Sequence, residues 1–441
     1  MIKRRRRRGI SLGTVVMLTL TGLVILGCFW LFPKLIGNVD LQFDARQLAV
    51  SIDQSFRSTN DSTVRRVNIN TPALAAAQIT PSPVLVTAPE KLSFSLTATG
   101  SININKAVQK ALTDRSGYRF SILFESLKSE INADLSIATL ENTSIETEKL
   151  TDNNIPIAAV SAIAEGGINC LSLGYDGIFN GGISGLQATQ EAVNSVGMTS
   201  YGVYASPRER SNPRILEVGG VSVALLGYQS DLSTTGKKKL SKEEQAFALA
   251  PPTLPTVVAD VASARALGAQ VIIASLSWGK KGASSPSQSQ RELALAFAQA
   301  GVDIILGTHS GTVQTIELFD VYRGEGQQSQ ALCAYSLGNL FTYDRDNRSL
   351  ISGILLHANV TYDLTSRTVS FDRLAYSPTY VWRGKEDGKT LYRVLISDMP
   401  PPSFVQEDQL DVMNRCLALV QETMAGTPIR LRKADEVVTG R

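Results

Sequence analysis

The alternation of short apolar runs with amphipathic stretches from Lys91 onward limits what this chain can fold into. The apolar run Val271–Leu276 precedes a helical stretch at Gln288–Ala300, and a second apolar run, Val302–Leu306, follows. Such alternation predicts an α/β architecture whose ligands gather at the carboxyl ends of parallel strands. On the same periodicity we expect further strands at 92–98, 134–140, 168–173 and 222–226, and further helices at 120–131, 157–164, 185–196 and 254–267.

The pattern becomes rich in strands after residue 312. Strands are expected at 312–318, 332–336, 351–362 and 368–376. A final helix is expected at 405–424, where Leu410, Met413 and Leu417 fall on one face. Together these elements predict an α/β fold in which two sheets form a sandwich flanked by helices.

The N-terminal 33 residues have the pattern of a membrane anchor. No residue from Ile10 to Phe32 is charged, and a helix of that length crosses a hydrocarbon core of roughly 30 Å. The preceding basic run Lys3–Arg8 predicts that the N-terminus stays in the cytoplasm and that the bulk of the chain is extracytoplasmic. We therefore predict a basic stub at 1–9, one transmembrane helix at 10–33 and a location in the plasma membrane. The alternatives are a cleavable signal peptide and a lipoprotein signal ending at Cys28.

Composition suggests the remaining divisions of the chain. Residues 34–90 are interpreted as an extracytoplasmic stalk, because Thr71–Glu90 contains four prolines. The globular part is expected at 91–380, and a C-terminal extension with a helix at 381–441. The formal charge of +3 includes the six positive charges of Lys3–Arg8, so the remainder carries about −3. A weakly acidic body with two histidines is not expected to bind nucleic acid.

Three of the four cysteines lie outside the predicted span. An odd and sparse set implies no disulfide framework. Cys170 and Cys333 occur in apolar runs and are expected to be small buried residues. The sequence leaves open whether two of Cys170, Cys333 and Cys416 form a single disulfide bridge.

Three short motifs in the second half of the chain indicate a family. They are Leu276–Gly279 (LSWG), Gly307–Gln314 (GTHSGTVQ) and Tyr335–Asn339 (YSLGN). The chain resembles the CapA family of poly-γ-glutamate capsule-synthesis proteins, whose members typically read HWG, G-x-H-P-H-V-x-Q and YSLGN at these places. The resemblance covers roughly residues 92–345. It implies the fold of calcineurin-like metallophosphoesterases.

Three earlier segments extend the resemblance. The first family motif is a strand that ends in Gly-Asp, and this chain has Gly100 and Ser101 there. The second motif, Asn-Leu-Glu, corresponds to Thr139–Glu141. The third, Ala-Asn-Asn-His followed by Asp and Gly, corresponds to Gly174–Gly182.

Most of the metal ligands that the resemblance implies are absent. Ser101 occupies the aspartate position, Gly177 and Ser277 occupy two histidine positions, and His309 keeps its imidazole. Divalent ions need converging carboxylate and imidazole ligands. We therefore expect no metal cofactor and no catalysis. A retained divalent ion is the alternative.

The candidate site residues follow from these positions. His309 is the candidate catalytic residue, and Glu141, Asp176 and His309 would hold a metal ion if one is retained. The candidate pocket residues are Ser101, Glu141, Asp176, Asn180, Ser277, Trp278 and Asn339.

Three functions remain open at this point. The first is a membrane-anchored binding module, without catalysis, that acts in capsule or poly-γ-glutamate assembly on an anionic or cell-wall polymer or an envelope protein. The second is a metal-dependent phosphoesterase-type hydrolase with an altered site. The third is a purely structural role in the envelope. The family association implies a bacterial plasma membrane, and a Gram-positive cell in particular.

Overall fold

The computed structural model describes residues 90–147, 149–323, 326–386 and 388–432. All of them belong to one unit that extends from Leu85 to Arg441. The stub, the anchor and almost the whole stalk predicted at 1–90 lie outside the described residues. Among the described helices, none combines the length and the apolar character needed to cross a bilayer.

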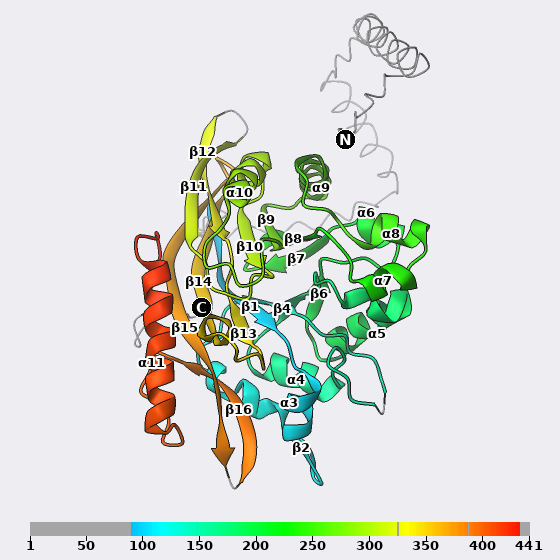
Figure 1. Ribbon diagram of the computed structural model, residues 1–441. Helices are drawn as coiled ribbons and strands as arrows, with labels where there is room; N and C mark the ends of the chain where they lie inside the picture. Colours follow the sequence, from blue (N-terminus) through cyan, green and yellow to red (C-terminus); the bar gives the residue numbers. More distant parts are fainter. Residues whose placement is uncertain (1–89, 148, 324–325, 387, 433–441) are drawn as a thin grey trace, which may run out of the picture. The chain divides into compact units, whose positions relative to one another are not determined.

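Two large sheets form the framework of the described residues (Figure 1). The nine-stranded sheet has the order β16–β15–β14–β1–β4–β5–β6, with β13 beside β1 and β17 beside β15. Its strands are β1 (Lys91–Ile102), β4 (Leu135–Leu140), β5 (Cys170–Ser172), β6 (Thr199–Tyr201), β13 (Asn339–Phe341), β14 (Ser352–Asp363), β15 (Thr368–Glu386), β16 (Lys389–Ile396) and β17 (Arg430–Leu431).

The six-stranded sheet has the order β11–β12–β10–β9–β8–β7 within the described part of the chain. Its strands are β7 (Arg214–Val218), β8 (Val221–Gln229), β9 (Val271–Ser277), β10 (Ile304–Thr308), β11 (Ile316–Arg323) and β12 (Gln327–Ala334). A small hairpin of β2 (Thr113–Asp114) and β3 (Gly117–Tyr118) stands apart from both sheets. Strands β8, β9, β10 and β12 run parallel, as do β1, β4, β5 and β6.

Three apolar cores hold the layers together. The middle core lies between the sheets and includes Leu96 of β1 and Ile273 of β9. An outer core on the nine-stranded sheet includes Val160 and Leu186, and one on the six-stranded sheet includes Val257 and Phe297. This is a sandwich of two sheets with helices on both outer faces, as predicted. Each of the three described cysteines is buried in a different core: Cys170 in the middle one, Cys416 and Cys333 in the outer ones, and all three are free thiols.

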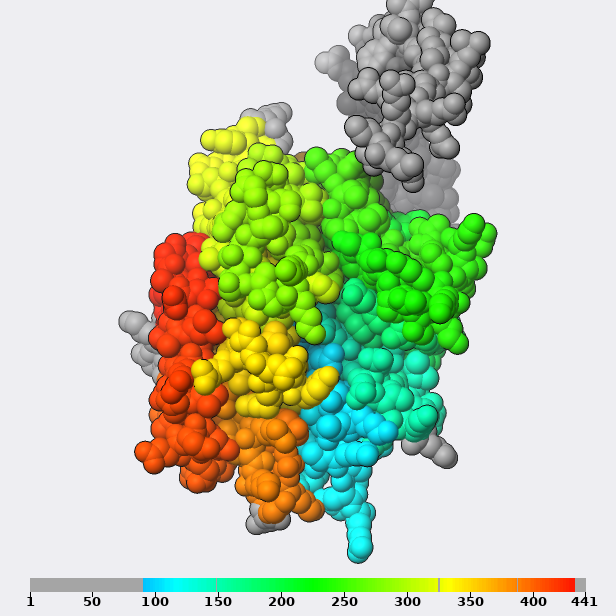
Figure 2. Space-filling model, in the orientation of Figure 1, coloured from blue at the N-terminus to red at the C-terminus, as the bar shows by residue number. Residues whose placement is uncertain are grey.

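The helices cover the outer faces. They are α3 (Lys106–Ala111), α4 (Ile157–Glu165), α5 (Gly182–Ser195), α6 (Pro207–Ser211), α7 (Thr234–Lys239), α8 (Lys242–Ala248), α9 (Leu254–Ala266), α10 (Gln288–Ala300) and α11 (Glu407–Met424), with the 3₁₀ turns η1 (Phe120–Leu123), η2 (Glu125–Leu127), η3 (Ile178–Gly181) and η4 (Arg348–Ile351). Figure 2 shows α11, in red, on the surface beside the yellow segment that contains η4.

Helix α10 illustrates how the sequence sets a boundary. Ser287 and Gln290 form a capping box, in which each side chain satisfies a backbone N–H of the other residue. Gly301 ends the helix with a φ of 116°, a left-handed conformation that suits glycine. The predicted range Gln288–Ala300 is therefore confirmed.

One predicted helix is wrong. The stretch 120–131 forms two short 3₁₀ turns, η1 and η2, in place of one α-helix. Phe120 and Leu123 are spaced by three residues, as are Phe124 and Leu127, and all four are buried. This spacing matches the three-residue period of a 3₁₀ helix.

The predicted boundary at residue 380 falls inside a strand. β15 runs across this position, and β16 follows it in the same sheet. Residues on both sides of position 380 therefore share one nine-stranded sheet.

Candidate functional site

Four of the predicted site residues lie at or near the carboxyl ends of parallel strands. Ser101 is near the end of β1, Glu141 directly follows β4, and Ser277 ends β9. His309 directly follows β10, and Asn339 begins β13. Asn339 is thus at the amino end of its strand, whereas the other four residues lie at or near carboxyl ends.

The segment Tyr335–Asn339 joins the two sheets at this edge. It leaves β12 of the six-stranded sheet and enters β13, which pairs with β1 in the nine-stranded sheet. Gly338 turns the chain with a φ of 73°, and its carbonyl accepts the N–H of Ser101 at 3.2 Å. A Cβ on Gly100 would overlap that carbonyl oxygen, so only glycine permits this approach.

Trp278 is a packing residue at this edge. Its indole Nε1 donates to the carbonyl oxygen of Tyr335 at 2.9 Å, and its ring stacks on the Tyr335 ring with centroids 5.9 Å apart. The side chain is buried. Gly307 leaves room for the indole, because a Cβ there would overlap Tyr335 O and approach Nε1.

Asn339 also holds the chain's own backbone. Its Nδ2 donates to the carbonyl oxygen of Gly311 at 3.1 Å and to that of Leu350 at 2.8 Å. These two bonds fix the turn after β10 against η4. A buried amide with both donor hydrogens occupied is a scaffold element.

The neighbourhood of η3 contains two further predicted residues. Asn180 Oδ1 accepts a hydrogen bond from the Ser233 hydroxyl at 2.5 Å, and Ser233 caps α7. Asp176 is exposed, and its backbone carbonyl accepts the N–H of Ser233 at 2.8 Å. Both residues therefore help attach α7 to the loop after β5.

Glu141 is half-buried and lies near Tyr175. Its backbone N–H donates to Ile102 O at 2.9 Å. Burial raises the pKa of the Tyr175 hydroxyl well above its usual value, and the negative charge of Glu141 adds to this shift. The phenol therefore stays neutral and can donate a hydrogen bond.

His309 has an unusual backbone. Its φ is 81°, one of three positive values among the described residues other than glycine. The side chain is half-buried, and within the described ranges its ring makes no hydrogen bond. A strained residue at a strand end is a reason to suspect function. The next residue, Ser310, is buried and within 2.8 Å of the Ser336 hydroxyl.

Comparison with known proteins places these motifs in a family. The profile described as "Bacterial capsule synthesis protein PGA_cap" matches residues 95–344, more than half of the chain. The chain belongs to this family. The predicted resemblance to CapA is thereby confirmed.

Two curated relatives of the PGA_cap chain come from bacilli. The "Capsule biosynthesis protein CapA" of Bacillus anthracis is 27% identical over 266 residues, which is 58% of this chain and 61% of the relative. The "PGA biosynthesis protein CapA" of Bacillus subtilis (strain 168) is 29% identical over 184 residues, which is 41% of this chain and 44% of the relative. The chain thus spans about three-fifths or less of the relatives it matches.

Solved structures similar to this PGA_cap chain include two phosphatase-like proteins. A phosphatase from Mycoplasma pneumoniae aligns over 73% of this chain and 99% of its own, with 13% identity and a TM-score of 0.37. The calcineurin-like phosphoesterase YfkN from Bacillus subtilis aligns over 76% and 99%, with 13% identity and a TM-score of 0.35.

The three candidate metal ligands do not form a cluster among the described residues. In the part of the chain that the structure describes, no group of three or more His, Cys, Asp or Glu is arranged to hold a metal. The set considered from the sequence, Glu141, Asp176 and His309, is therefore not brought together as ligands. The physical reason is local: Asp176 is exposed on the loop after β5, where its backbone carbonyl accepts the N–H of Ser233.

Two residues near the strand ends that carry a buried polar atom were missed from the sequence. The Tyr175 hydroxyl and the Gln229 Oε1 are buried without a hydrogen-bond partner, and so is the Ser101 hydroxyl. Tyr175 lies in the loop after β5, Gln229 ends β8, and Ser101 is near the end of β1. Gln229 was missed because the strand was expected to stop at Leu226, whereas β8 continues to Gln229. Buried polar atoms without partners call for a physical explanation, such as a ligand or water.

Proposed function

We propose that this protein is a plasma-membrane-anchored, extracytoplasmic member of the PGA_cap family. It binds a cell-envelope polymer during capsule or poly-γ-glutamate assembly and does not hydrolyse it. The names of the two relatives support a role in capsule or poly-γ-glutamate assembly. The uncharged segment Ile10–Phe32 and the basic run before it support the anchor.

The observation that carries the proposal is what the retained motif residues do. Trp278 Nε1, Asn339 Nδ2 and Asn180 Oδ1 each form hydrogen bonds with groups of the chain itself. They keep the strand ends in place. A hydrolase would direct such groups at a substrate or a metal-bound nucleophile.

The strand ends offer neutral polar atoms for binding. The unpartnered hydroxyls of Ser101 and Tyr175 and the amide oxygen of Gln229 are suited to hydrogen bonds with amide or hydroxyl groups. Such groups occur along a polymer backbone. We also assign the half-buried His309, which directly follows β10, to polymer contact.

A metal and activity assay tests the absence of catalysis. The full-length protein, purified in detergent, is dialysed against Zn²⁺ and Mn²⁺ and then against metal-free buffer. We expect no stoichiometric metal by mass spectrometry and no turnover of p-nitrophenyl phosphate. Stoichiometric metal that is lost in His309→Ala and retained in His357→Gln would overturn the proposal, because these are the two histidines of the chain.

Cell fractionation tests the anchor. Deleting residues 10–33 should move the protein from the membrane fraction to the soluble fraction, since the remaining chain offers no comparable apolar run. Replacing Lys3–Arg8 with glutamine is the matched control and should leave it in the membrane fraction. Retention of the deleted form in membranes would contradict the anchor assignment.

A further inference from the structure

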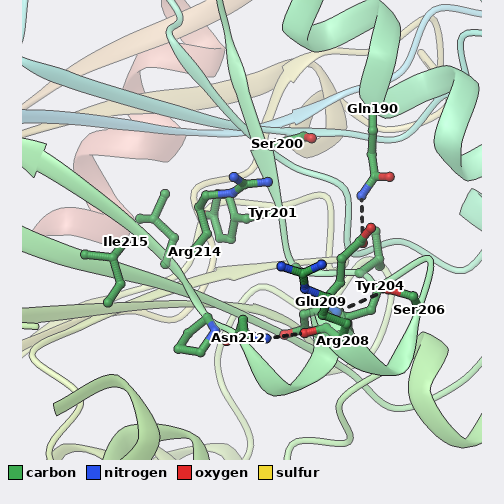
Figure 3. A pocket seen from close by; sticks show the side chains of 14 residues that line it. Gln190, Ser200, Tyr201, Tyr204, Ser206, Arg208, Glu209, Asn212, Arg214 and Ile215 are labelled. Carbon is green, nitrogen blue, oxygen red and sulfur yellow. Dashed lines mark hydrogen bonds between the residues drawn. The ribbon is translucent and has the colours of Figure 1, made fainter. Parts of the chain in front are cut away.

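A cavity opens where the two sheets part, at the edge formed by β6 and β7. Its volume is about 520 Å³, which is within the range of small-molecule sites. Figure 3 shows Tyr201, Arg208, Glu209 and Arg214 around it. None of its lining residues is among the site residues predicted from the sequence.

Arg214 occupies an inward position on β7. In the antiparallel register it pairs with Leu225 of β8, and residues that pair directly share one face of a sheet. The next inward positions on β7 are Leu216 and Val218, which pack against the core between the sheets. Arg214 is thus a cation at the end of an otherwise apolar row.

Contacts across the gap show that the cavity reaches the middle core. The Tyr201 hydroxyl of β6 lies 2.6 Å from the Ser275 hydroxyl of β9, so this side chain spans both sheets. Burial raises the pKa of the Cys170 thiol on β5, and the positive charge of Arg214 opposes that shift. Arg214 lines the same cavity as Tyr201, and its side chain is exposed to solvent there.

A second guanidinium faces the same cavity. Arg208 reaches it from α6, and across the described ranges neither its side chain nor that of Arg214 has an ion-pair or hydrogen-bond partner. The neighbouring carboxylate is already engaged, because Glu209 Oε2 accepts the N–H of Ala205 at 2.9 Å and lies 3.5 Å from Gln190 Nε2. Figure 3 shows Glu209 turned toward Gln190.

We propose that this cavity binds the carboxylate of a small ligand with an amide or apolar body. Guanidinium groups bind carboxylates through paired, charge-assisted hydrogen bonds. Two arginines and one glutamate leave a local charge of +1, which a singly charged carboxylate neutralises and a phosphate dianion would exceed. Tyr201, Tyr204 and Ile215 supply the wall for an uncharged body. This inference does not depend on the proposed function.

An inward-pointing charge can also serve a different purpose. Exposed edge strands such as β7 are often protected from pairing with other chains by such a charge. Protection of the β7 edge would need the charge of Arg214 alone. It gives no reason for a second unpaired arginine, Arg208, beside a cavity of this size.

Calorimetric titration of the full-length protein with hippurate tests the proposal. Hippurate carries one carboxylate, one amide and one ring, and its neutral amide, hippuramide, has the same shape. We expect hippurate to bind in the millimolar range or tighter, and hippuramide not to bind. Arg208→Gln and Arg214→Gln should each weaken hippurate binding about tenfold, because each removes charge-assisted hydrogen bonds.

Matched variants separate the outcomes. Arg415→Gln is the control, since Arg415 is an exposed residue of α11 paired with Asp411, and it should leave the affinity unchanged. Arg214→Lys should retain part of the affinity. Equal binding of hippuramide, tighter binding of inorganic phosphate, or full hippurate affinity in Arg208→Gln would overturn the proposal. So would an Arg214→Gln variant that aggregates on concentration yet keeps its hippurate affinity, which would assign Arg214 to edge protection.

Discussion

At the scale of single residues, the motif glycines are sites of backbone contact. Gly100 lies against the Gly338 carbonyl where β1 meets the connection between the sheets. Gly100→Ala should destabilise the protein by about 3 kcal/mol, because a methyl group in this space forces two backbone segments apart. Urea denaturation followed by circular dichroism measures this change.

Gly174 is the matched control at the end of β5. An added Cβ there would have ordinary contacts, the nearest at 3.6 Å from Gln229 Oε1. Gly174→Ala should therefore change the stability by no more than about 1 kcal/mol. Equal losses in the two variants would mean that the overlap with Gly338 is not what restricts position 100.

The positive φ of His309 leads to a second prediction. A β-branched residue is strained at a φ of 81°, so His309→Val should lose at least about 1 kcal/mol of stability. His309→Gly should remain close to the wild type, since relief of strain offsets the greater freedom of the unfolded chain. Thermal unfolding of both variants provides the comparison. A Val variant as stable as the wild type would show that the left-handed conformation is not needed.

The sequence located these residues better than it described their roles. The order of the motifs was enough to place Ser101, Ser277 and His309 at strand ends, because parallel strands align their carboxyl ends. It could not show that Asn339 binds Gly311 and Leu350, since those partners are distant in the chain. It also gave no sign of Arg214, whose inward direction follows only from its pairing with Leu225.

At the scale of elements, strong periodicity was decisive. Helices α9 and α10 were predicted within one or two residues, because each is a long run bounded by clear end signals. Short elements were not foreseen, among them α6, β6 and β16. Three to eight residues give too few repeats for a period to be read.

Strand β14 carries a pH-dependent element at its centre. His357 is buried, with its ring nitrogens 3.2 Å from the hydroxyls of Thr97 on β1 and Ser377 on β15. Burial, with a smaller effect from the positive charge of Arg432, lowers the pKa of His357 to about 3. His357 is therefore a buried structural residue of the nine-stranded sheet.

This low pKa predicts acid sensitivity. The native state excludes a proton that the unfolded chain accepts below about pH 6.5, so the stability from this residue is complete above pH 6.5 and declines as the pH falls toward 3. Between pH 7 and pH 4 the loss should be about 3 kcal/mol. Urea titrations at both pH values should show a smaller loss in His357→Gln. An identical loss in both proteins would contradict the prediction.

At the scale of the whole molecule, the family segment does not contain a complete sheet. The match ends at residue 344, whereas β14, β15 and β16 follow it, and β14 pairs with β1 along nine positions. A chain that ends at residue 344 should therefore fail to fold, because β1 would lose its neighbour and both adjoining cores would be exposed. A chain that ends at residue 432 should fold normally. Expression and protease resistance of the two forms test this. A soluble, resistant shorter form would contradict it.

The placement of one cysteine in each apolar core makes the thiols local reporters of stability. Burial raises the pKa values of Cys170, Cys333 and Cys416, so the reactive thiolate is scarce while each core stays closed. An alkylating reagent can modify a given cysteine only when the apolar core around that cysteine opens. Mass spectrometry of the modified peptides would therefore rank the three cores by how often each one opens. No probe needs to be added to the protein.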